Sequence, residues 1–347
     1  MKVFTVSGLE GSTLCFRKFL NAVDTYQADV GILLGDLTGR SVAAVTRKGP
    51  SSWEVPLNGK VHEIDSPAAL AEVTAAIADR GDYWIEQTPE EYEHTRNNPL
   101  LVDLYFKSLV RERVEEWLTL ADERLGSGGP PILVAPGCGD WTVIDDVLEH
   151  GGRLTPCDDR IVDVDGYQVV TSSSSGPTEW ELVREMDDRQ LHGKLLDLCS
   201  GIGDPDYAIV NLQADSRAAQ RIVKRFQPIV RMMGTTQGSP GGASKRGRTL
   251  ELSPRSKLVE DADPTLYGVL VLLENGEVKD YVFTEAKTEL VQRRSAATEP
   301  AGGGPPRVPA RRLPRWPRLR RSRPARRVRA RGPADRSAAA RPPAPRG

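Results

Sequence analysis

Acidic and thiol side chains follow three segments of this chain that are predicted to be buried strands. Glu10 follows the apolar segment 2–6, Asp36 follows the segment 29–34, and Cys138 follows the segment 132–135. Each of them stands beside glycine, which is typical of a strand that ends in a tight turn. In an α/β sheet such turns gather at one edge, which is where ligands bind. Two carboxylates there are hard ligands that suit Mg²⁺ or Mn²⁺, whereas a thiol suits softer metals.

Nitrogen ligands are missing from these turns. Imidazole is the commonest metal ligand in proteins. The chain has four histidines, and none of them lies in a strand-end turn: His62, His94, His150 and His192. Glu10 and Asp36 alone therefore predict at most one loosely bound cation, because a lone carboxylate pair neutralises little of a metal's charge.

The elements that must position these residues alternate between strand and helix. Ser12 predicts the start of a helix that runs to about Tyr26. With strands at 2–6 and 29–34 on either side, this is a βαβ unit, which favours parallel pairing. A long amphipathic stretch at 98–125 predicts a helical excursion over the sheet, and the pair Asn275-Gly276 predicts a hairpin turn. Further strands are predicted at 41–46, 60–64, 132–135, 161–165, 167–171, 207–212, 228–233, 249–252, 267–273 and 277–283.

With these elements in place, the chain resembles the calcineurin-like metallophosphoesterases, and most closely their small archaeal-type members. That family has a D-x-H turn after the first strand, G-D after the second, G-N-H/D after the third, then a lone His and a G-H-x-H turn. The resemblance covers about residues 1–285 and rests on the order of the turns and on four segments: FRKFLNA (16–22), GILLGDLTG (31–39), IDDVLE (144–149) and GRTLELSP (247–254). It implies an α/β fold, a four-layer α-β-β-α sandwich with mixed sheets, over residues 1–290.

The resemblance also implies where two metals would bind. Family members hold two divalent metals about 3.5–4 Å apart, which clamp a phosphoryl group and activate water. In this chain only Asp36 matches a family ligand, the metal-bridging aspartate. The other positions are degenerate: Gly8 and Glu10 in the first turn, Cys138 and Gly139 in the third, Gln213 at the lone His, and Thr235 and Gln237 in the last turn. Glu10, Cys138 and Gln213 are weak candidate ligands, and we expect no cofactor or a single weakly bound Mn²⁺ or Mg²⁺.

Each of these residues also has a structural interpretation. Asp36 either binds a residual cation or caps the segment that follows it through its carboxylate. Glu10 is expected to be a solvated turn residue, and Cys138 a buried or half-buried thiol rather than a nucleophile. Asp140 is expected to cap the helix that begins at Trp141. The serine run 172–175 is expected to form a loop.

The charges divide the chain into two parts. Residues 301–347 hold 15 Arg, no Lys and a single acid, Asp335, a net charge of +14. Because the whole chain carries 47 basic and 48 acidic residues, residues 1–300 hold 32 and 47, a net charge of −15. The stretch 295–347 is rich in Arg, Pro and Ala and is predicted to be a disordered tail. It either binds nucleic acid nonspecifically through phosphates or is a solvated or spurious extension without a partner.

These observations predict a pseudo-phosphoesterase that acts as a binding or regulatory module, with a phosphate-containing ligand in its cleft as one possible partner. The alternatives are a weak or altered metal-dependent phosphohydrolase and a nucleic-acid-binding protein that acts through the tail. Four scattered cysteines predict reduced thiols and a cytoplasmic location. No stretch approaches the roughly 18 apolar residues of a membrane span, so no membrane partner is expected.

Overall fold

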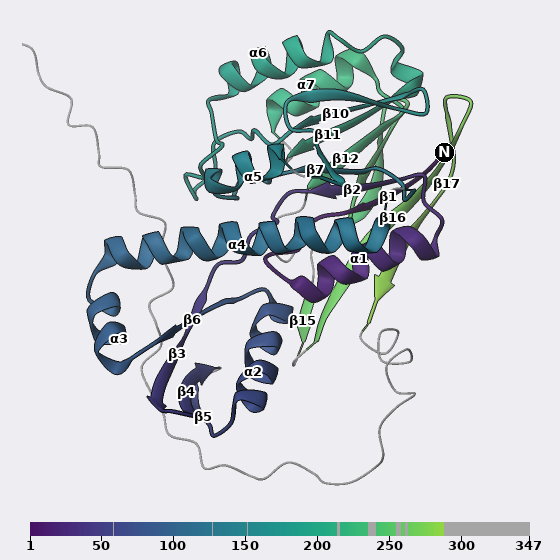
Figure 1. The fold of residues 1–347 in the computed structure, drawn as a ribbon. Coiled ribbons are helices and arrows are strands. Elements are labelled where there is room, and N and C mark those ends of the chain that lie inside the picture. The colour runs from purple at the N-terminus through teal and green to yellow at the C-terminus, as the bar shows by residue number, and fades with distance from the viewer. Residues whose placement is uncertain are drawn as a thin grey trace, which may run out of the picture.

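A computed structural model describes residues 1–57, 59–126, 128–150, 152–213, 216–234, 241–254, 258–260 and 263–287. Within these residues the chain forms two large β-sheets and one small sheet, with helices packed around them (Figure 1). The predicted tail from residue 295 lies outside the described residues.

The first large sheet begins with the predicted βαβ unit. Strand β1 pairs parallel with β2, β2 with β7, and β7 with β8, whereas β16 lies antiparallel to β1 and carries β17 on its other side. The order of strands is β15-β16-β1-β2-β7-β8. The bounds are β1 Lys2–Val6, β2 Val30–Leu34, β7 Ile132–Ala135, β8 Leu154–Pro156, β15 Leu258–Glu260, β16 Asp263–Glu274 and β17 Glu277–Ala286.

The second large sheet is also mixed. Strands β10, β11, β12 and β14 run parallel, and β9 and β13 pair antiparallel at its two borders. The order of strands is β13-β14-β12-β11-β10-β9. The bounds are β9 Arg160–Val164, β10 Tyr167–Ser172, β11 Ala208–Gln213, β12 Val230–Gly234, β13 Gly242–Arg246 and β14 Thr249–Ser253.

The two large sheets pack face to face, with helices on their outer faces. Ile32 and Val271 of the first sheet share one apolar cluster with Ile209 and Met232 of the second, and all four side chains are fully buried. A second cluster joins the outer face of the first sheet to α1, α4 and α5, and a third joins the second sheet to α6 and α7. The predicted α-β-β-α sandwich with mixed sheets is confirmed. The helices are α1 Thr13–Thr25, α4 Pro99–Leu125, α5 Asp145–Glu149, α6 Asp188–Cys199 and α7 Arg217–Phe226, with 3-10 turns η1 Thr142–Ile144 and η2 Pro205–Tyr207.

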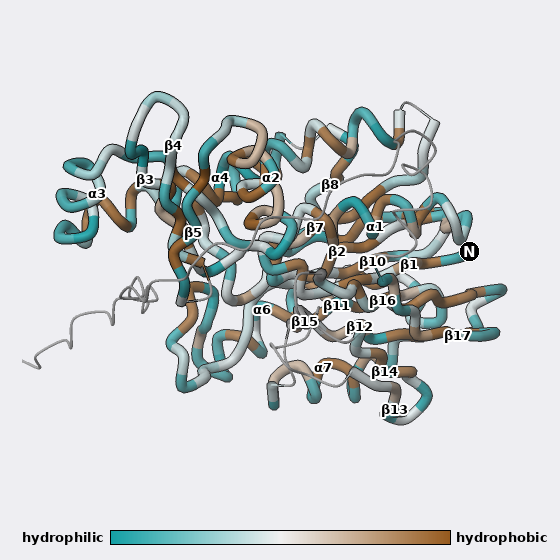
Figure 2. The backbone as a smooth tube through the Cα atoms, turned by 90° about the horizontal axis from the view of Figure 1, so that it is seen from below, coloured by the Kyte–Doolittle hydropathy of each residue, from teal (hydrophilic) through white to brown (hydrophobic). Residues whose placement is uncertain are grey.

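Hydropathy follows these layers. In Figure 2 the strands of the two large sheets run through the middle of the molecule mainly in brown, while helix α3 is mostly teal. Strand β2 is buried along its whole length, as expected for a parallel strand that is covered on both faces. No helix among the described residues is long and apolar enough to cross a membrane.

A small third sheet is inserted between β2 and β7. It was predicted only as short strands at 41–46 and 60–64, but it has four strands in the order β5-β4-β3-β6 and its own apolar cluster under helix α2. Two of its strands were missed: one contains Pro56, which disfavours a strand, and the other spans only five residues. The bounds are β3 Val42–Gly49, β4 Ser52–Leu57, β5 Lys60–Ile64, β6 Tyr83–Gln87, α2 Pro67–Arg80 and α3 Pro89–Arg96.

Local signals set several boundaries as predicted. Ser12 is the N-cap of α1, and its hydroxyl accepts a hydrogen bond from the backbone N–H of Cys15. Asn275 and Gly276 both have positive φ angles, 49° and 71°, as a type I′ hairpin turn requires. The helical excursion at 98–125 is helix α4, and it forms part of the core because Phe106 and Trp117 are only 2% exposed.

Candidate functional site

Three strand-end turns meet at one edge of the first sheet. In the turn after β1, the backbone N–H groups of Gly8 and Glu10 donate to the carbonyls of Gly35 and Asp36, at 3.1 and 2.7 Å. The turn after β7 approaches from the other side, since a Cβ added to Gly137 would lie 2.3 Å from the backbone nitrogen of Asp36. Only glycine fits this contact. The sequence-predicted convergence of these turns is therefore present.

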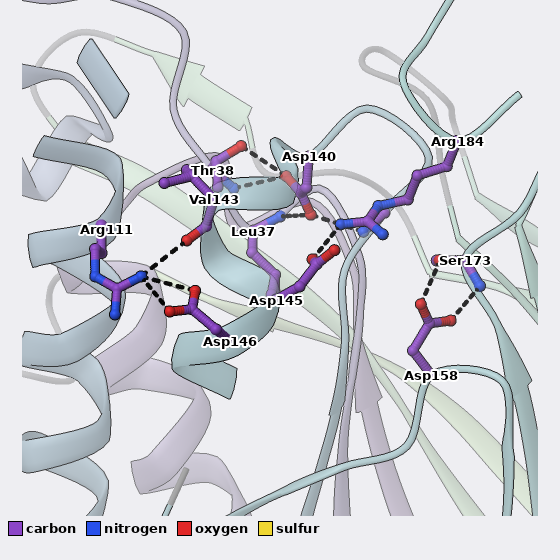
Figure 3. Close-up of polar contacts among 11 residues, drawn as sticks. Leu37, Thr38, Arg111, Asp140, Val143, Asp145, Asp146, Asp158, Ser173 and Arg184 are labelled. Atoms are coloured by element: carbon purple, nitrogen blue, oxygen red, sulfur yellow. Dashed lines mark hydrogen bonds and ion pairs between the residues drawn. The ribbon is translucent and has the colours of Figure 1, made fainter. Parts of the chain in front are cut away.

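Asp140 holds the second and third turns together (Figure 3). Its carboxylate is 1% exposed and accepts hydrogen bonds from the N–H groups of Leu37 and Thr38, both at 2.9 Å. It also accepts from the Thr38 hydroxyl and from the N–H of Gly137, both at 2.7 Å. Asp140 was expected to cap the next helix. That expectation is wrong, because η1 and α5 have no side-chain cap and the carboxylate turns inward to amides about 100 residues away.

Cys138 is half-buried beside several acidic groups. Burial, together with the negative charges of Asp36, Asp140 and Glu185, raises the pKa of its thiol to about 11. At neutral pH only about one molecule in ten thousand would carry the thiolate, which is the nucleophilic and metal-binding form. Cys138 thus has the properties of an inert thiol.

Glu10 and Asp36 lie in strained turns. Their φ angles are 45° and 47°, in the left-handed region that non-glycine residues seldom adopt. Glu10 was expected to be solvated, but it is only 9% exposed, so that expectation is wrong. The turn that carries it is covered from outside, because Arg113 of α4 donates to the carbonyl of Gly11 at 2.6 Å and Gly81 packs against the same glycine.

The second sheet brings buried hydroxyls to the same region. Ser172, Ser173, Ser174 and Ser175 are each at most 5% exposed, and Ser172 is the last residue of β10, so the expected loop is only partly correct. The N–H and hydroxyl of Ser173 both donate to Asp158, at 2.7 and 2.6 Å. Burial raises the pKa of the Asp158 carboxyl above its usual range, whereas its bonds to Ser173 lower it. Sequence reasoning missed Asp158.

Two basic side chains lie among these groups. Arg184 is 12% exposed at its side chain and forms an ion pair with Asp145 (Figure 3). Lys194 of α6 donates to the hydroxyl of Ser174 at 2.7 Å and pairs with Asp159 at 2.6 Å. Both cations already have anionic partners. No local motif marked them, because the contacts join segments 20–39 residues apart.

The remaining predicted positions are divided between the two sheets. Gln213 is the last residue of β11 and pairs in register with Gly234 of β12, but its side chain lies outside the described residues. Thr235 and Gln237 also lie outside them. Gly139 is buried in the turn after β7, and Gly8 is buried in the turn after β1. The turns of the first sheet thus meet one another, while the convergence of the second sheet's turns stays a prediction.

Among the residues that the structure describes, the donors at this edge do not fit two divalent metals. The Asp140 oxygens are occupied by four protein donors, and burial and nearby negative charges raise the pKa of the Cys138 thiol. In the part of the chain that the structure describes, no three His, Cys, Asp or Glu side chains are grouped as a metal site would need. Two neighbouring dications require several anionic or imidazole ligands to offset their charge. Asp36 and Glu10 cannot supply them.

Comparisons with known proteins give structural likenesses only. No protein-family profile and no curated protein matches the sequence. The protein TT1561 of Thermus thermophilus is 12% identical, with 82% of this chain and 98% of that chain covered at a TM-score of 0.47. A hypothetical protein from the same organism is 10% identical, with coverage of 83% and 99% and a TM-score of 0.41. Wild-type Vps29 from Entamoeba histolytica, complexed with Zn²⁺, is 12% identical, with coverage of 49% and 88% and a TM-score of 0.24. At these scores the likenesses assign neither a family nor an activity.

Proposed function

We propose that this protein is a phosphoesterase-like module that no longer hydrolyses phosphoesters and instead binds or regulates another molecule. The observation that carries the proposal is the network of Asp140. A carboxylate at the centre of the strand-end edge accepts four protein hydrogen bonds and so braces the turns. The edge is thereby held in shape by the protein's own donors.

The charges at the edge support the loss of catalysis. Asp36, Asp140 and Glu185 all act on the Cys138 thiol as negative charges. A phosphoester brings further negative charge, which metals would have to neutralise for the attack of water. The nearby cations, Arg184 and Lys194, are engaged by carboxylates. A phosphate group would be repelled here unless a cation came with it, so a ligand that carries positive charge is favoured electrostatically.

A weak metal-dependent phosphohydrolase is the alternative. It would use Asp36, the one residue that matches a family ligand, with Glu10 and a single Mn²⁺ or Mg²⁺. One hard cation with two carboxylates is chemically reasonable. Glu10, however, has 9% of its surface exposed, which restricts access of a hydrated metal ion.

Metal content and turnover separate the two functions. Purified protein would be dialysed against Mn²⁺ and analysed for bound metal, then assayed with a chromogenic phosphodiester. We expect less than one metal per chain and no turnover above that of the Asp36→Ala variant. The matched control is Asp146→Ala, because Asp146 is an exposed carboxylate outside the turns. Two tightly bound metals, with turnover that Asp36→Ala abolishes and Asp146→Ala preserves, would refute the proposal.

A further inference from the structure

A loop between β10 and α6 exposes a tryptophan beside the strand-end edge. Residues 176–187, which we call the acidic loop, hold four acidic residues and a single basic residue, Arg184. Trp180 has 67% of its surface exposed and Val183 has 46%. Large apolar side chains that solvent reaches together mark interaction sites. Tryptophan is also one of the residue types most enriched among the side chains that dominate binding energy.

Hydrogen bonds hold the two ends of the acidic loop together. The N–H of Met186 donates to the carbonyl of Ser175 at 3.1 Å, and the N–H of Ser175 donates to the carbonyl of Arg184 at 3.2 Å. The side chain of Arg184 pairs with Asp145 of α5, which attaches this end of the loop to the strand-end edge (Figure 3). The acidic loop is therefore ordered before any ligand arrives, so a ligand loses little affinity to ordering it.

The surroundings of Trp180 favour a ligand that is both apolar and cationic. Glu179 and Glu181 flank the tryptophan, and both are exposed. Carboxylates attract cations over several ångströms. A guanidinium group can also lie on the face of an indole ring, which is the aromatic surface that cations prefer. A segment that alternates arginine with apolar residues combines both interactions.

One segment of the tail has this chemistry. Residues 311–321 read R-R-L-P-R-W-P-R-L-R-R, and their large apolar residues recur at every third position: Leu313, Trp316 and Leu319. Each of the three is preceded by arginine, and the first two are followed by proline. A polyproline II conformation has three residues per turn, so it would set these apolar side chains along one side and the preceding arginines along another. Proline-rich segments in this conformation bind aromatic surfaces.

The tail is long enough to bring this segment to the acidic loop of its own chain. From Lys287, the last described residue, to Arg311 the chain can span about 80 Å, at about 3.3 Å per residue. A domain of roughly 290 residues has a radius of gyration of about 19 Å, so this span covers its surface. Linkage raises the effective concentration of such a segment to the order of 1 mM. The net charges, −15 for residues 1–300 and +14 for residues 301–347, attract each other.

We propose that residues 311–321 dock on the acidic loop of the same chain. The apolar side of the segment lies against Trp180, and its arginines lie beside Glu179 and Glu181. Docking gives the basic tail a partner within its own chain, and nucleic acid would compete with the acidic loop for the same arginines. This inference involves neither Asp36 nor a metal, so it is independent of the function proposed for the strand-end edge.

Limited digestion of the full chain with trypsin tests the proposal. Trypsin cuts after arginine, and the segment has such sites at residues 312, 315 and 318, while sites at 327 and 329 lie beyond it and serve as an internal reference. Cleavage follows the population of the open form when opening is fast. A segment that is docked four-fifths of the time is therefore cut about fivefold more slowly than a free one. Mass spectrometry of the early fragments gives the rate at each site.

Substitutions in the acidic loop should remove this protection. Trp180→Ala is expected to raise the rates within the segment about fivefold and to leave the reference rates unchanged. The double variant Glu179→Lys with Glu181→Lys is expected to have the same effect. Phe283→Ala is the matched control, because Phe283 is 43% exposed on β17, which lies across the molecule from α5 in Figure 1, and this variant should resemble wild type. Circular dichroism verifies that all three variants fold.

The protection should be the same at about 1 and 50 µM protein, because a docked tail of the same chain does not depend on concentration. Equal rates within the segment for wild type and Trp180→Ala would overturn the proposal. A protection that Phe283→Ala removes as fully as Trp180→Ala would also overturn it. Protection that appears only at the higher concentration would replace docking within the chain by docking between chains.

Discussion

Replacement of Asp140 should reveal how much of the strand-end edge depends on one carboxylate. Asp140→Ala removes the acceptor of three backbone N–H groups and one hydroxyl, all in a site where the carboxylate is 1% exposed. Each such bond contributes about 1 kcal/mol net, and more when the acceptor is charged. We therefore expect the free energy of unfolding to fall by about 4 kcal/mol, a size that single substitutions reach only when a buried network is broken.

Asp140→Asn distinguishes lost hydrogen bonds from lost volume. Asparagine has nearly the same shape, but one of its two terminal groups donates hydrogen bonds. Leu37 and Gly137 both donate to the same oxygen, Oδ2, and Thr38 donates twice to Oδ1, so one pair of donors must face the new NH₂ group. Unsatisfied buried donors cost about 1–3 kcal/mol each. The Asn variant should therefore be almost as unstable as the Ala variant.

Urea denaturation followed by tryptophan fluorescence measures both changes, with Asp146→Ala as the control. Asp146 is a near neighbour in sequence but is exposed and pairs with Arg111 at the surface, where ion pairs contribute little. Its midpoint should match that of wild type. If the free energy of unfolding of Asp140→Asn lies within about 1 kcal/mol of that of wild type, the inference that backbone N–H groups donate to this carboxylate is wrong.

Two further predictions follow from the thiols and the charges. Because Cys15, Cys157 and Cys199 are fully buried, Cys138 should be the thiol of the native chain that an alkylating reagent labels first. Its rate should rise with pH until about pH 11, because the reactive thiolate forms only near its raised pKa, and Asp36→Asn should move that profile to lower pH by removing a negative charge. A rate that is already maximal at pH 8 would contradict this. Truncation at residue 295 should remove any retention of the chain on immobilised DNA, because residues 1–300 carry a net charge of −15 while residues 301–347 carry +14. Retention that survives truncation would show that the tail is not the binding segment.

Local signals were sufficient for much of the first sheet and for its helices. The boundaries of α1, the helix at 98–125 and the turn at Asn275 and Gly276 were all predicted, because caps, periodicity and turn residues act within a few positions of one another. The four layers were implied by the resemblance, and the structure shows them through its apolar clusters.

The small third sheet could not be predicted in full. Strand β4 alternates, but Pro56 disfavours a strand, and β6 is short and ends in the polar residues Glu86 and Gln87. What stabilises these strands is the apolar cluster under α2, which includes Trp53 and Ile77. Such clusters form between segments, so no single segment displays them.

The sequence by itself determined which chemistry is missing: no histidine follows a strand end, and Asp36 alone matches the ligands of the resembled family. The tertiary structure decided what the remaining side chains do. Asp140 was expected to cap a helix, but it joins two turns, because its four donors come from residues 37, 38 and 137. Glu10 is buried because α4 covers the turn that carries it. The physical reason is that hydrogen bonds depend on distance in space and not on separation along the sequence. A carboxylate binds the donors that packing brings within about 3 Å of it, and those can lie anywhere along the chain.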